Sequence, residues 1–416
     1  MADEDSRDPF DDLRRAVGDP GVRSPYPRLA ELRRAGPVHR IDAEELAGSL
    51  ADGPDAAERI RSWMPREGWA VVSHVGVSQV LLDGATFSSC GWAATLGAAI
   101  GPTLLQLDGA EHRCQRGLVQ QAFTPAALAR WETDVVAPSV ARRVDVFAER
   151  GSSDLVRELT FPLPIEIIAR MIGIPEAERA RFHRDAVGLM GIGFDWERGL
   201  AASRSLADLL RPLVQARRAD PADDLIGSLV RAELNGARLS DEEICAFLAL
   251  LVPAGAETPF RASSNLLLGL LEHPDQLDAV RDDRSLIPRA IEEGLRWEAP
   301  VTAVLRLSTR RAEVCGVEIP ADSPVLVSLA SANRDETRYE QADLFNVFRE
   351  PKHHAAFAFG PHACLGMHLA RSESRILVET LFDRLPGLRL EPGASEVRVS
   401  GCNLRSPFTL PIRFNR

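Results

Sequence analysis

The sequence predicts a mainly α-helical protein that carries small β-sheets. Residues 111–284 are mostly helical in pattern, with short turns that contain glycine, proline or Asn-Gly. Residues 301–330 and 389–414 instead contain short apolar runs separated by turn residues, which is typical of strands. Hydrophobic residues make up 45% of the 416-residue chain. A chain of this length and composition can bury a sizeable core.

Several local patterns define further elements. Residues 69–72 form a short apolar run that predicts a strand, and a helix-like pattern follows. Ser240 and Glu243 have the spacing of a capping box, which indicates the start of a strong helix. Residues 90–107 are rich in glycine and alanine without a clean period, so we expect a long apolar loop. Residues 188–196, GLMGIGFDW, are expected to form a flexible lid.

Composition disfavours several classes of protein. A net charge of −11 argues against a nucleic-acid-binding protein, which must neutralise phosphates. The six cysteines are scattered and form no CxxC pair, so neither a disulfide framework nor a structural zinc site is predicted. No apolar run approaches the roughly 20 residues of a membrane span, and the charged N-terminus is unlike a signal peptide. We therefore expect a cytoplasmic protein with no membrane anchor.

The domain organisation is expected to be simple. We predict an N-terminal arm over residues 1–24 and a single domain over residues 25–416. No strand-GxGxxG-helix unit is visible, so neither a dinucleotide-binding domain nor a fused reductase is expected.

The long apolar helix in the middle of the chain contains an unusual interruption. Pro253, Gly255 and Pro259 lie inside this helical run, and each weakens or bends a helix. A carboxylate and a hydroxyl, on Glu257 and Thr258, lie at the same place. Backbone carbonyls released at a kink can hold water, so a small ligand could dock there. The alternative is a helix boundary with solvated polar residues.

Two charged patterns are also open to two interpretations. Glu293 and Arg296 have i, i+3 spacing and share a helix face, which is most often a surface salt bridge. His112 and Arg116 have i, i+4 spacing, so they form a basic patch that either binds an anion or is solvated.

Cys364 lies in the turn-rich stretch FAFGPHACLG, residues 357–366, directly before a helical pattern. A cysteine in such a place can be a buried small hydrophobe, a nucleophile or a metal ligand. The stretch alone does not choose between these roles.

In their order and spacing, these stretches resemble the motifs of the cytochrome P-450 family of haem-thiolate enzymes. The matching motifs are F-x-x-G-x-x-x-C-x-G (Phe357, Gly360, Cys364, Gly366), E-x-x-R with a later arginine (Glu293, Arg296, Arg349), A-G-x-(D/E)-T (Ala254, Gly255, Glu257, Thr258) and E-H-x-x-x-R (Glu111, His112, Arg116). The resemblance spans roughly residues 25–415. It implies the P-450 fold, with haem between the long kinked oxygen-binding helix and the helix that follows the cysteine.

The resemblance also implies a role for each motif. Cys364 is expected to be the thiolate ligand of the iron of haem b, a ligand that donates electron density to the metal. Phe357, Gly360 and Gly366 are expected to shape its loop. The expected partners of the haem propionates are His112, Arg116, Arg306 and His362. The expected buried ionic core consists of Glu293, Arg296 and Arg349. The expected proton relay to O2 consists of Glu257 and Thr258.

The function implied is that of a monooxygenase, which activates O2 with two external electrons and hydroxylates a hydrophobic small molecule. We expect the electrons to come from NAD(P)H through a ferredoxin reductase and a ferredoxin. The basic face on which the ferredoxin could dock consists of Arg113, Arg116, Arg371 and Arg375. The expected substrate pocket consists of Trp92, Leu96, Ile100, Val252, Ala256, Val301, Val304 and the 402–404 turn with Leu404. A monomer is expected. The alternatives are a peroxide-driven or rearranging haem-thiolate enzyme, and a non-catalytic haem sensor.

The chain departs from the family pattern at several positions, none of which removes an expected ligand. These positions are Ala358, where glycine or serine is usual; Ala363, where phenylalanine is common; Pro253 and Pro259; and Gly109-Ala110, where Pro-Pro is common.

Overall fold

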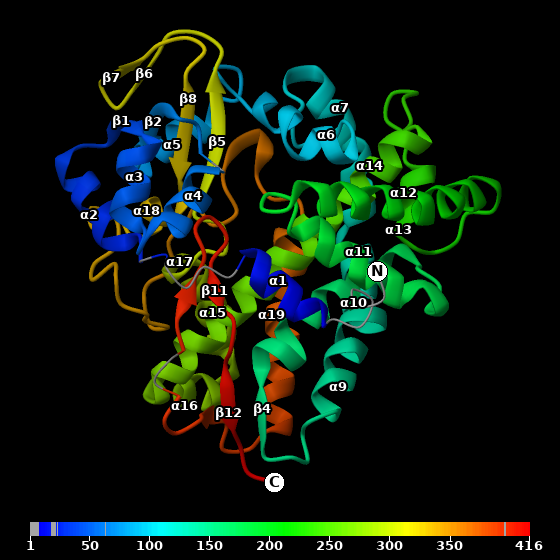
Figure 1. Ribbon diagram of the computed structural model, residues 1–416. Coiled ribbons are helices and arrows are strands. Elements are labelled where there is room, and N and C mark those ends of the chain that lie inside the picture. Colours follow the sequence, from blue (N-terminus) through cyan, green and yellow to red (C-terminus); the bar gives the residue numbers. More distant parts are fainter. Residues whose placement is uncertain (1–7, 18–21, 23, 63, 395–396) are drawn as a thin grey trace.

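The computed structural model describes residues 8–17, 22, 24–62, 64–394 and 397–416. Figure 1 shows the sheet strands β1, β2, β5 and β8 on one side of the molecule and most of the longer helices on the other. The fold is mainly α-helical with small sheets, so the predicted fold class is confirmed.

Helices make up most of the described chain. They are α1 (Pro9–Val17), α2 (Tyr26–Ala35), α3 (Ala43–Leu50), α4 (Pro54–Ser62), α5 (His74–Leu82), α6 (Leu96–Ile100), α7 (Gly109–Gln120), α8 (Pro125–Trp131), α9 (Ala137–Asp145), α10 (Pro162–Ile172), α11 (Arg179–Met190), α12 (Trp196–Ala219), α13 (Leu225–Arg231), α14 (Asp241–Val252), α15 (Thr258–Glu272), α16 (Pro274–Asp282), α17 (Ile287–Trp297), α18 (Leu329–Asn333) and α19 (Met367–Arg384). Short 3-10 or π-helical segments include η1 (Cys90–Ala94), η3 (Glu132–Val136), η4 (Val156–Thr160), η6 (Pro253–Glu257) and η8 (Gly360–His362).

The strands are short. They are β1 (Val38–Asp42), β2 (Glu67–Val71), β3 (Phe87–Ser88), β4 (Ser152–Asp154), β5 (Ala303–Ser308), β6 (Ala312–Val314), β7 (Val317–Ile319), β8 (Pro324–Ser328), β9 (Arg389–Leu390), β10 (Val399–Ser400), β11 (Ser406–Pro407) and β12 (Pro411–Arg413). The strands predicted within residues 301–330 and 389–414 are therefore confirmed, as is the strand-helix pair β2 and α5.

The largest sheet has the strand order β1-β2-β8-β5-β3. β2 and β8 run parallel, and the other neighbours are antiparallel. β1 and β2 pair along their whole length, although α3 and α4 lie between them in the sequence. Asp42 begins α3 by accepting hydrogen bonds from the backbone N–H groups of Glu44 and Glu45. The two helices then cover one face of the sheet, where Ile60 packs in a cluster with Ala70.

The central helix is built from α14, η6 and α15, which run on without a gap as residues 241–272. Its start is the predicted capping box of Ser240 and Glu243, in which both hydrogen bonds are present. The predicted interruption is η6, a π-helical turn that contains Pro253. A π-helical turn inserts an extra residue, so the residues beyond it are rotated relative to an unbroken α-helix.

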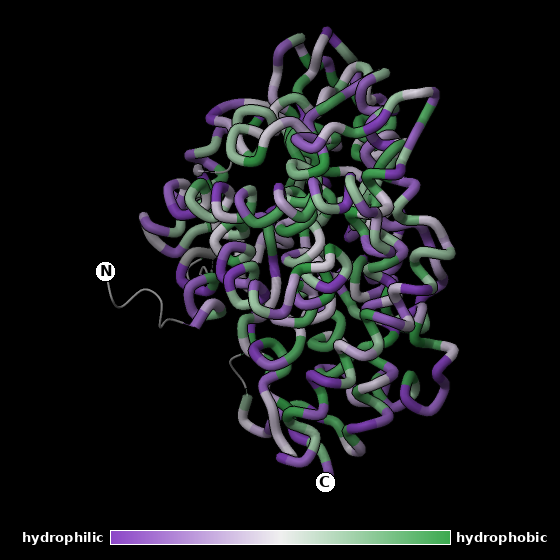
Figure 2. Tube along the Cα trace, turned by 90° about the vertical axis from the view of Figure 1, so that its right-hand side faces the viewer, coloured by the Kyte–Doolittle hydropathy of each residue, from purple (hydrophilic) through white to green (hydrophobic). Residues whose placement is uncertain are grey.

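This helix is long and apolar enough to cross a membrane by length and composition, but 56% of its most apolar window is buried inside the protein. Figure 2 shows apolar segments concentrated in the interior and polar segments along much of the outline. Because α15 packs on α17, β11 and α19, the helix serves as the core of this fold.

Two segments differ from the sequence-based expectation. Residues 90–107, expected as a loop, contain η1 and α6. Within the expected N-terminal arm, residues 9–17 form α1. Phe10 and Leu13 of α1 are 3% and 0% exposed, because their i, i+3 spacing places both side chains on the helix face that packs against the core.

Candidate active site

Cys364 lies on a closed loop that leads into α19. The backbone N–H of Cys364 donates to the carbonyl of Phe357 at 2.9 Å, which closes the loop across its base. Cys364 has accessible surface, yet desolvation by the surrounding protein raises the pKa of its thiol. The backbone of Gly366, and Arg116, act in the opposite direction and favour the thiolate.

The backbone of this loop is tight at two positions. Gly360 has a φ of 71°, and a Cβ on it would lie 2.3 Å from the carbonyl oxygen of Leu81. Only glycine therefore fits there. Ala358 has a φ of 54°, in the left-handed region that alanine rarely adopts. The departure from glycine at residue 358 therefore strains the loop.

The histidines expected to bind the propionates lie together. The rings of His112 and His362 have centroids 4.1 Å apart. His112 is 2% exposed, and its Nε2 has no hydrogen-bond partner among the described residues. Burial lowers the pKa of both, to about 4 for His362, so both are neutral near pH 7. Nε2 of His362 lies 3.3 Å from Oδ1 of Asp108, a residue that the sequence did not single out.

The two arginines expected at the same place have few acidic partners. Arg306 is 7% exposed, its Nη1 donates to the carbonyl of Leu305 at 2.8 Å, and burial lowers its pKa to about 10. Arg116 donates from Nη2 to the carbonyl of Ala363 at 2.8 Å. The guanidinium groups of Arg306 and Arg116 offer more hydrogen-bond donors than the neighbouring acceptors satisfy, and Nε2 of His112 has no partner among the described residues. Further acceptors would therefore stabilise this cluster. These residues therefore fit the two propionate carboxylates of a haem.

The middle of the central helix presents Thr258 and Ala254 on one side. Thr258 donates from Oγ1 to the carbonyl of Ala254 at 2.7 Å. Ala254 is exposed, although most of its helix neighbours are buried. α15, which begins at Thr258, packs against α19, the helix that follows Cys364.

Glu257 has a different orientation from Thr258. Its carboxylate forms an ion pair with Arg261, with Oε1 2.6 Å from Nη2. The side chains of Glu257 and Arg261 are 3% and 0% exposed. The structure therefore does not place the two members of the expected relay side by side.

The three residues of the expected ionic core come together. The carboxylate of Glu293 accepts hydrogen bonds from Nε and Nη2 of Arg296, each at 2.7 Å. Nε of Arg349 lies 3.2 Å from both carboxylate oxygens of Glu293. Arg296 also donates to the carbonyls of Asn333 and Ala342, at 3.0 and 2.7 Å. Glu293 and Arg296 are 4% and 3% exposed, so this is not the surface salt bridge that an isolated E-x-x-R usually forms.

The residues expected in the substrate pocket divide into two groups. Val252 and Ala256 are each 1% exposed and belong to the main hydrophobic core, so they do not line an accessible pocket. Ala254 is accessible instead, because the π-helical turn changes which residues face outward. Half-buried residues remain compatible with a pocket wall. They are Trp92 and Leu96, Ile100 on the edge of the main core, Val301 with its bridge partner Leu404, and Val304, which packs with Val301 against the sheet cluster.

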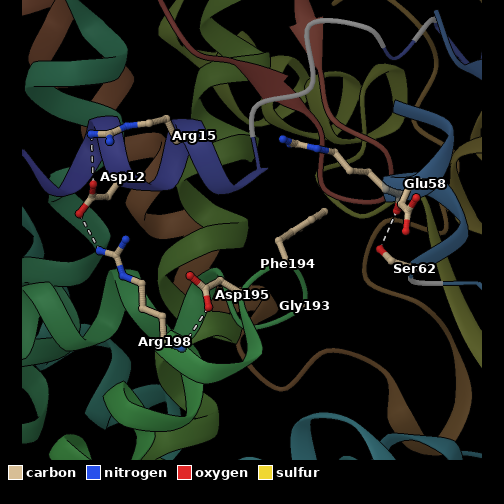
Figure 3. A pocket seen from close by; sticks show the side chains of 9 residues that line it. Asp12, Arg15, Glu58, Ser62, Gly193, Phe194, Asp195 and Arg198 are labelled. Carbon is tan, nitrogen blue, oxygen red and sulfur yellow. Dashed lines mark hydrogen bonds and ion pairs between the residues drawn. The ribbon is translucent and has the colours of Figure 1, made fainter. Parts of the chain in front are cut away.

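The expected lid is shorter than predicted, because residues 188–190 are buried in the last turn of α11. The remaining connection carries Phe194, which is 39% exposed, and α12 begins at Trp196, which is 42% exposed. The connection borders a cavity of about 500 Å³ that is also lined by α1, α4 and Arg198 of α12, and Figure 3 shows Phe194 between α1 and α4. Asp12 of α1 contacts Arg198 at 2.6 Å, which ties α1 to the first turn of α12.

Comparison with solved structures agrees with this fold. The chain is similar to a Bacillus megaterium enzyme, CYP109E1, crystallised in complex with testosterone, with a TM-score of 0.82 and 29% identity. The match covers 94% of this chain and 100% of that chain. Fold and site together define a haem-thiolate monooxygenase.

Sequence comparison identifies the family. The Cytochrome P450 family profile matches residues 193–386. The erythromycin C-12 hydroxylase of Saccharopolyspora erythraea is 37% identical over 348 residues, which cover 81% of this chain and 87% of that protein. The monooxygenase PikC of Streptomyces venezuelae is 33% identical over 415 residues, or 96% and 94% of the two chains. The chain belongs to the cytochrome P450 family, whose members use a haem with a cysteine thiolate and O2.

Proposed function

We propose that this monooxygenase hydroxylates a hydrophobic small molecule in the cytoplasm, with Cys364 as the iron ligand and two electrons from a separate redox partner. The observation that carries the proposal is the Cys364 thiol, which is accessible on a closed loop directly before α19. The donor-rich set around His112 and Arg306 supports it, because a haem brings two carboxylates.

The chain's own residues hold the cofactor and keep its ligand ionised. His112, Arg116, Arg306 and His362 would bind the propionates. The backbone N–H of Gly366 and the nearby guanidinium of Arg116 would stabilise negative charge on the Cys364 sulfur. When bound, the haem supplies the activation of O2.

On the other side of the site, Thr258 would hold a proton at Oγ1. Its hydroxyl now donates to the Ala254 carbonyl in the π-helical turn, so it can also accept a hydrogen bond from a water or a ligand. Ala254 has no bulk beyond its Cβ, which leaves room next to that hydroxyl.

A ferredoxin with its reductase is the proposed electron source. Arg113 is exposed, whereas Arg371 pairs with Glu292 at 2.6 Å and Arg375 with Glu132 at 2.8 Å. The positive charge of the proposed docking face is therefore partly neutralised, and Arg113 is its most available residue.

The substrate class follows from similarity. One relative is named for the hydroxylation of erythromycin and one similar structure holds testosterone, so large cyclic hydrophobic molecules are the substrates to test first. Half-buried apolar residues such as Trp92 and Leu96 suit such a ligand.

The reduced carbon-monoxide difference spectrum tests this assignment. The parent protein is expected to show the thiolate-type band, and Cys364→Ser is expected to lose it. A parent protein without that band would refute the assignment. A spin-state titration with a library of macrolides, steroids and terpenoids would then identify the substrate, and turnover with NAD(P)H and a ferredoxin system would establish the activity.

A further inference from the structure

The connection between β10 and β11, residues 401–405, forms a tight turn at the tip of a hairpin. Gly401 begins this 401–405 turn with a φ of 102°, and a Cβ on Gly401 would collide with the carbonyl oxygen of Leu404. Only glycine therefore fits at the start of the turn. Leu404 near its other end is half-buried, and Arg405, the next residue, is buried.

Arg405 holds the turn closed from inside the protein. Its Nη1 donates to the carbonyl of Gly401 at 2.9 Å, so the side chain bridges the two ends of the turn. Its Nε donates to Oε1 of Glu298 at 3.0 Å, and the two side chains are 2% and 4% exposed. Burial by itself would lower the pKa of Arg405, but the Glu298 carboxylate raises it overall, so the guanidinium stays charged. Because a buried charge without a partner is very unfavourable, Glu298 determines where Arg405 lies.

Glu298 is itself fixed by groups from three other parts of the chain. The hydroxyl of Tyr26, on α2, donates to its Oε1 at 2.7 Å. Nη2 of Arg334 lies 3.8 Å from its Oε2. Asn265, on α15, donates from Nδ2 to the backbone carbonyls of Glu298 and Arg405, at 2.9 and 3.0 Å. The Glu298–Arg405 ion pair is therefore anchored to the central helix and to α2.

Hydrogen bonds also join the turn to the segment that follows α17. The backbone N–H of Arg405 donates to the carbonyl of Pro300, and that of Thr302 donates to the carbonyl of Asn403, at 3.0 and 2.8 Å. The side chain of Asn403 adds a contact, because its Oδ1 accepts the backbone N–H of Ala303 at 3.0 Å. The tip of the hairpin and residues 300–303 therefore form one unit.

Val301 and Leu404 form the bridge that lies between these hydrogen bonds. Both are half-buried apolar residues, and both are compatible with the wall of a substrate pocket. Arg405 and Glu298 are too deeply buried to contact a ligand in that pocket. They can act on a ligand only through the position of the turn.

We propose that Arg405 is a positioning residue that determines which ligands the substrate pocket accepts. Its contacts with Glu298 and the Gly401 carbonyl hold the 401–405 turn in one conformation. Leu404 and Val301 therefore stay together as one wall, which selects ligands by the size and outline of their apolar groups. The inference rests on the proposed function, in which this pocket belongs to a haem enzyme.

The first test compares two ligands of the haem iron that differ in size, imidazole and the much bulkier clotrimazole. Both bind through an imidazole nitrogen, so spectral titration of the haem-loaded protein gives a Kd for each without turnover. Arg405→Met is expected to weaken clotrimazole binding about tenfold or more, since one methylene contact in an apolar pocket changes binding by about 10–200-fold. Imidazole is too small to need the wall, so its Kd is expected to be unchanged. An unchanged ratio of the two Kd values in Arg405→Met would overturn the proposal.

The second test asks whether Arg405 acts through Leu404. Leu404→Ala is expected to weaken clotrimazole binding as well, because it removes part of the wall itself. The double variant Leu404→Ala/Arg405→Met is expected to lose no more than the larger of the two single losses, because both changes disable one wall. Losses that multiply in the double variant would show that Arg405 acts elsewhere and would refute the inference.

Arg33, on α2, provides a matched control. Its side chain is 5% exposed, its Nε lies 2.8 Å from Oε2 of Glu336, and its Nη1 donates to Ser331, outside the 401–405 turn. Arg33→Met is expected to lower the free energy of unfolding and to leave the ratio of the two Kd values unchanged. A ratio that changes as much as in Arg405→Met would show that loss of any buried arginine has this effect, and would contradict the proposal.

A further variant keeps the proposal testable if Arg405→Met does not fold. Arg405→Lys keeps the charge next to Glu298 but lacks the planar fork that also reaches the Gly401 carbonyl. It is expected to show a smaller loss of the same selective kind, and an unchanged ratio would overturn the proposal. A parent protein that binds neither ligand and lacks the carbon-monoxide band would reject the proposed function. A parent that binds both, with variants that keep its ratio, would reject the role of Arg405 alone.

Discussion

Substitution of Arg296 by alanine should unfold much of this protein and release its haem. The change removes a guanidinium that is 3% exposed and that makes two bonds of 2.7 Å to Glu293. It also leaves the carbonyls of Asn333, Ala342 and Leu344 without this donor. Removing one partner of a buried ion pair costs about 3–5 kcal/mol, because the other charge stays buried. Since whole domains are stable by about 5–15 kcal/mol, a large part of the total is lost.

Urea unfolding followed by circular dichroism, together with haem content per chain, measures this effect. Arg296→Lys keeps the charge but loses the two-pronged geometry, so an intermediate loss is expected. Arg40→Ala is the matched surface control, because Arg40 and Glu67 form an exposed pair with side-chain exposures of 75% and 67%. Its expected cost is below about 1 kcal/mol. Arg296→Ala protein with full haem and an unfolding free energy within about 1 kcal/mol of the parent would refute this reasoning.

Three further outcomes are expected. Thr258→Ala should lower the product formed per NAD(P)H and release more hydrogen peroxide, and unchanged coupling in a peroxide assay would contradict its role at the Ala254 carbonyl. Ala358→Gly should raise the unfolding free energy by about 0.5–1 kcal/mol, because glycine tolerates the φ of 54°; urea denaturation without a gain would show that the loop is unstrained. Burial raises the pKa of Glu292, but Arg371 and His354 outweigh it and lower the pKa to about 2. A carboxyl whose pKa is lowered by folding stabilises the folded state at pH values above the unfolded pKa of 4.5, and this stabilisation is lost as the pH falls towards 2. Glu292→Gln should therefore lower the free energy of unfolding at neutral pH. The difference in free energy of unfolding between parent and variant should decrease below pH 4.5. If urea titrations show the same difference in free energy of unfolding from neutral pH down to pH 2, the Glu292 ion pair is not the cause of that difference.

Local patterns were sufficient for most elements of the fold. The capping box at Ser240 and the short strands near residues 301–330 depend on neighbours in the sequence, and both are present in the structure. The α1 helix depends on partners far along the chain, since Phe10 packs against Phe161 and Phe408. No pattern within residues 1–24 contains those partners.

Local patterns also failed where a helix is irregular. Val252 and Ala256 were expected in the substrate pocket, yet each is 1% exposed in the main core beside the π-helical turn that contains Pro253. Which residues face outward at such a turn depends on tertiary packing, which the broken helical pattern does not contain. Asp108 belongs to no local motif. Its partner His362 lies more than 250 positions later in the chain, and only the fold brings its Nε2 to 3.3 Å from the Asp108 carboxylate.

The sequence by itself determined the chemistry available to this protein: a cysteine on a turn before a helix, an acid beside an alcohol in a broken helix, and the E-x-x-R pair. These depend on residue identity and short spacing, which the chain carries before it folds. The tertiary structure alone decided how those groups face one another. Glu257 and Thr258 are neighbours in sequence, yet the carboxylate pairs with Arg261 and the hydroxyl bonds to the carbonyl of Ala254, because a charge removed from water requires a buried partner.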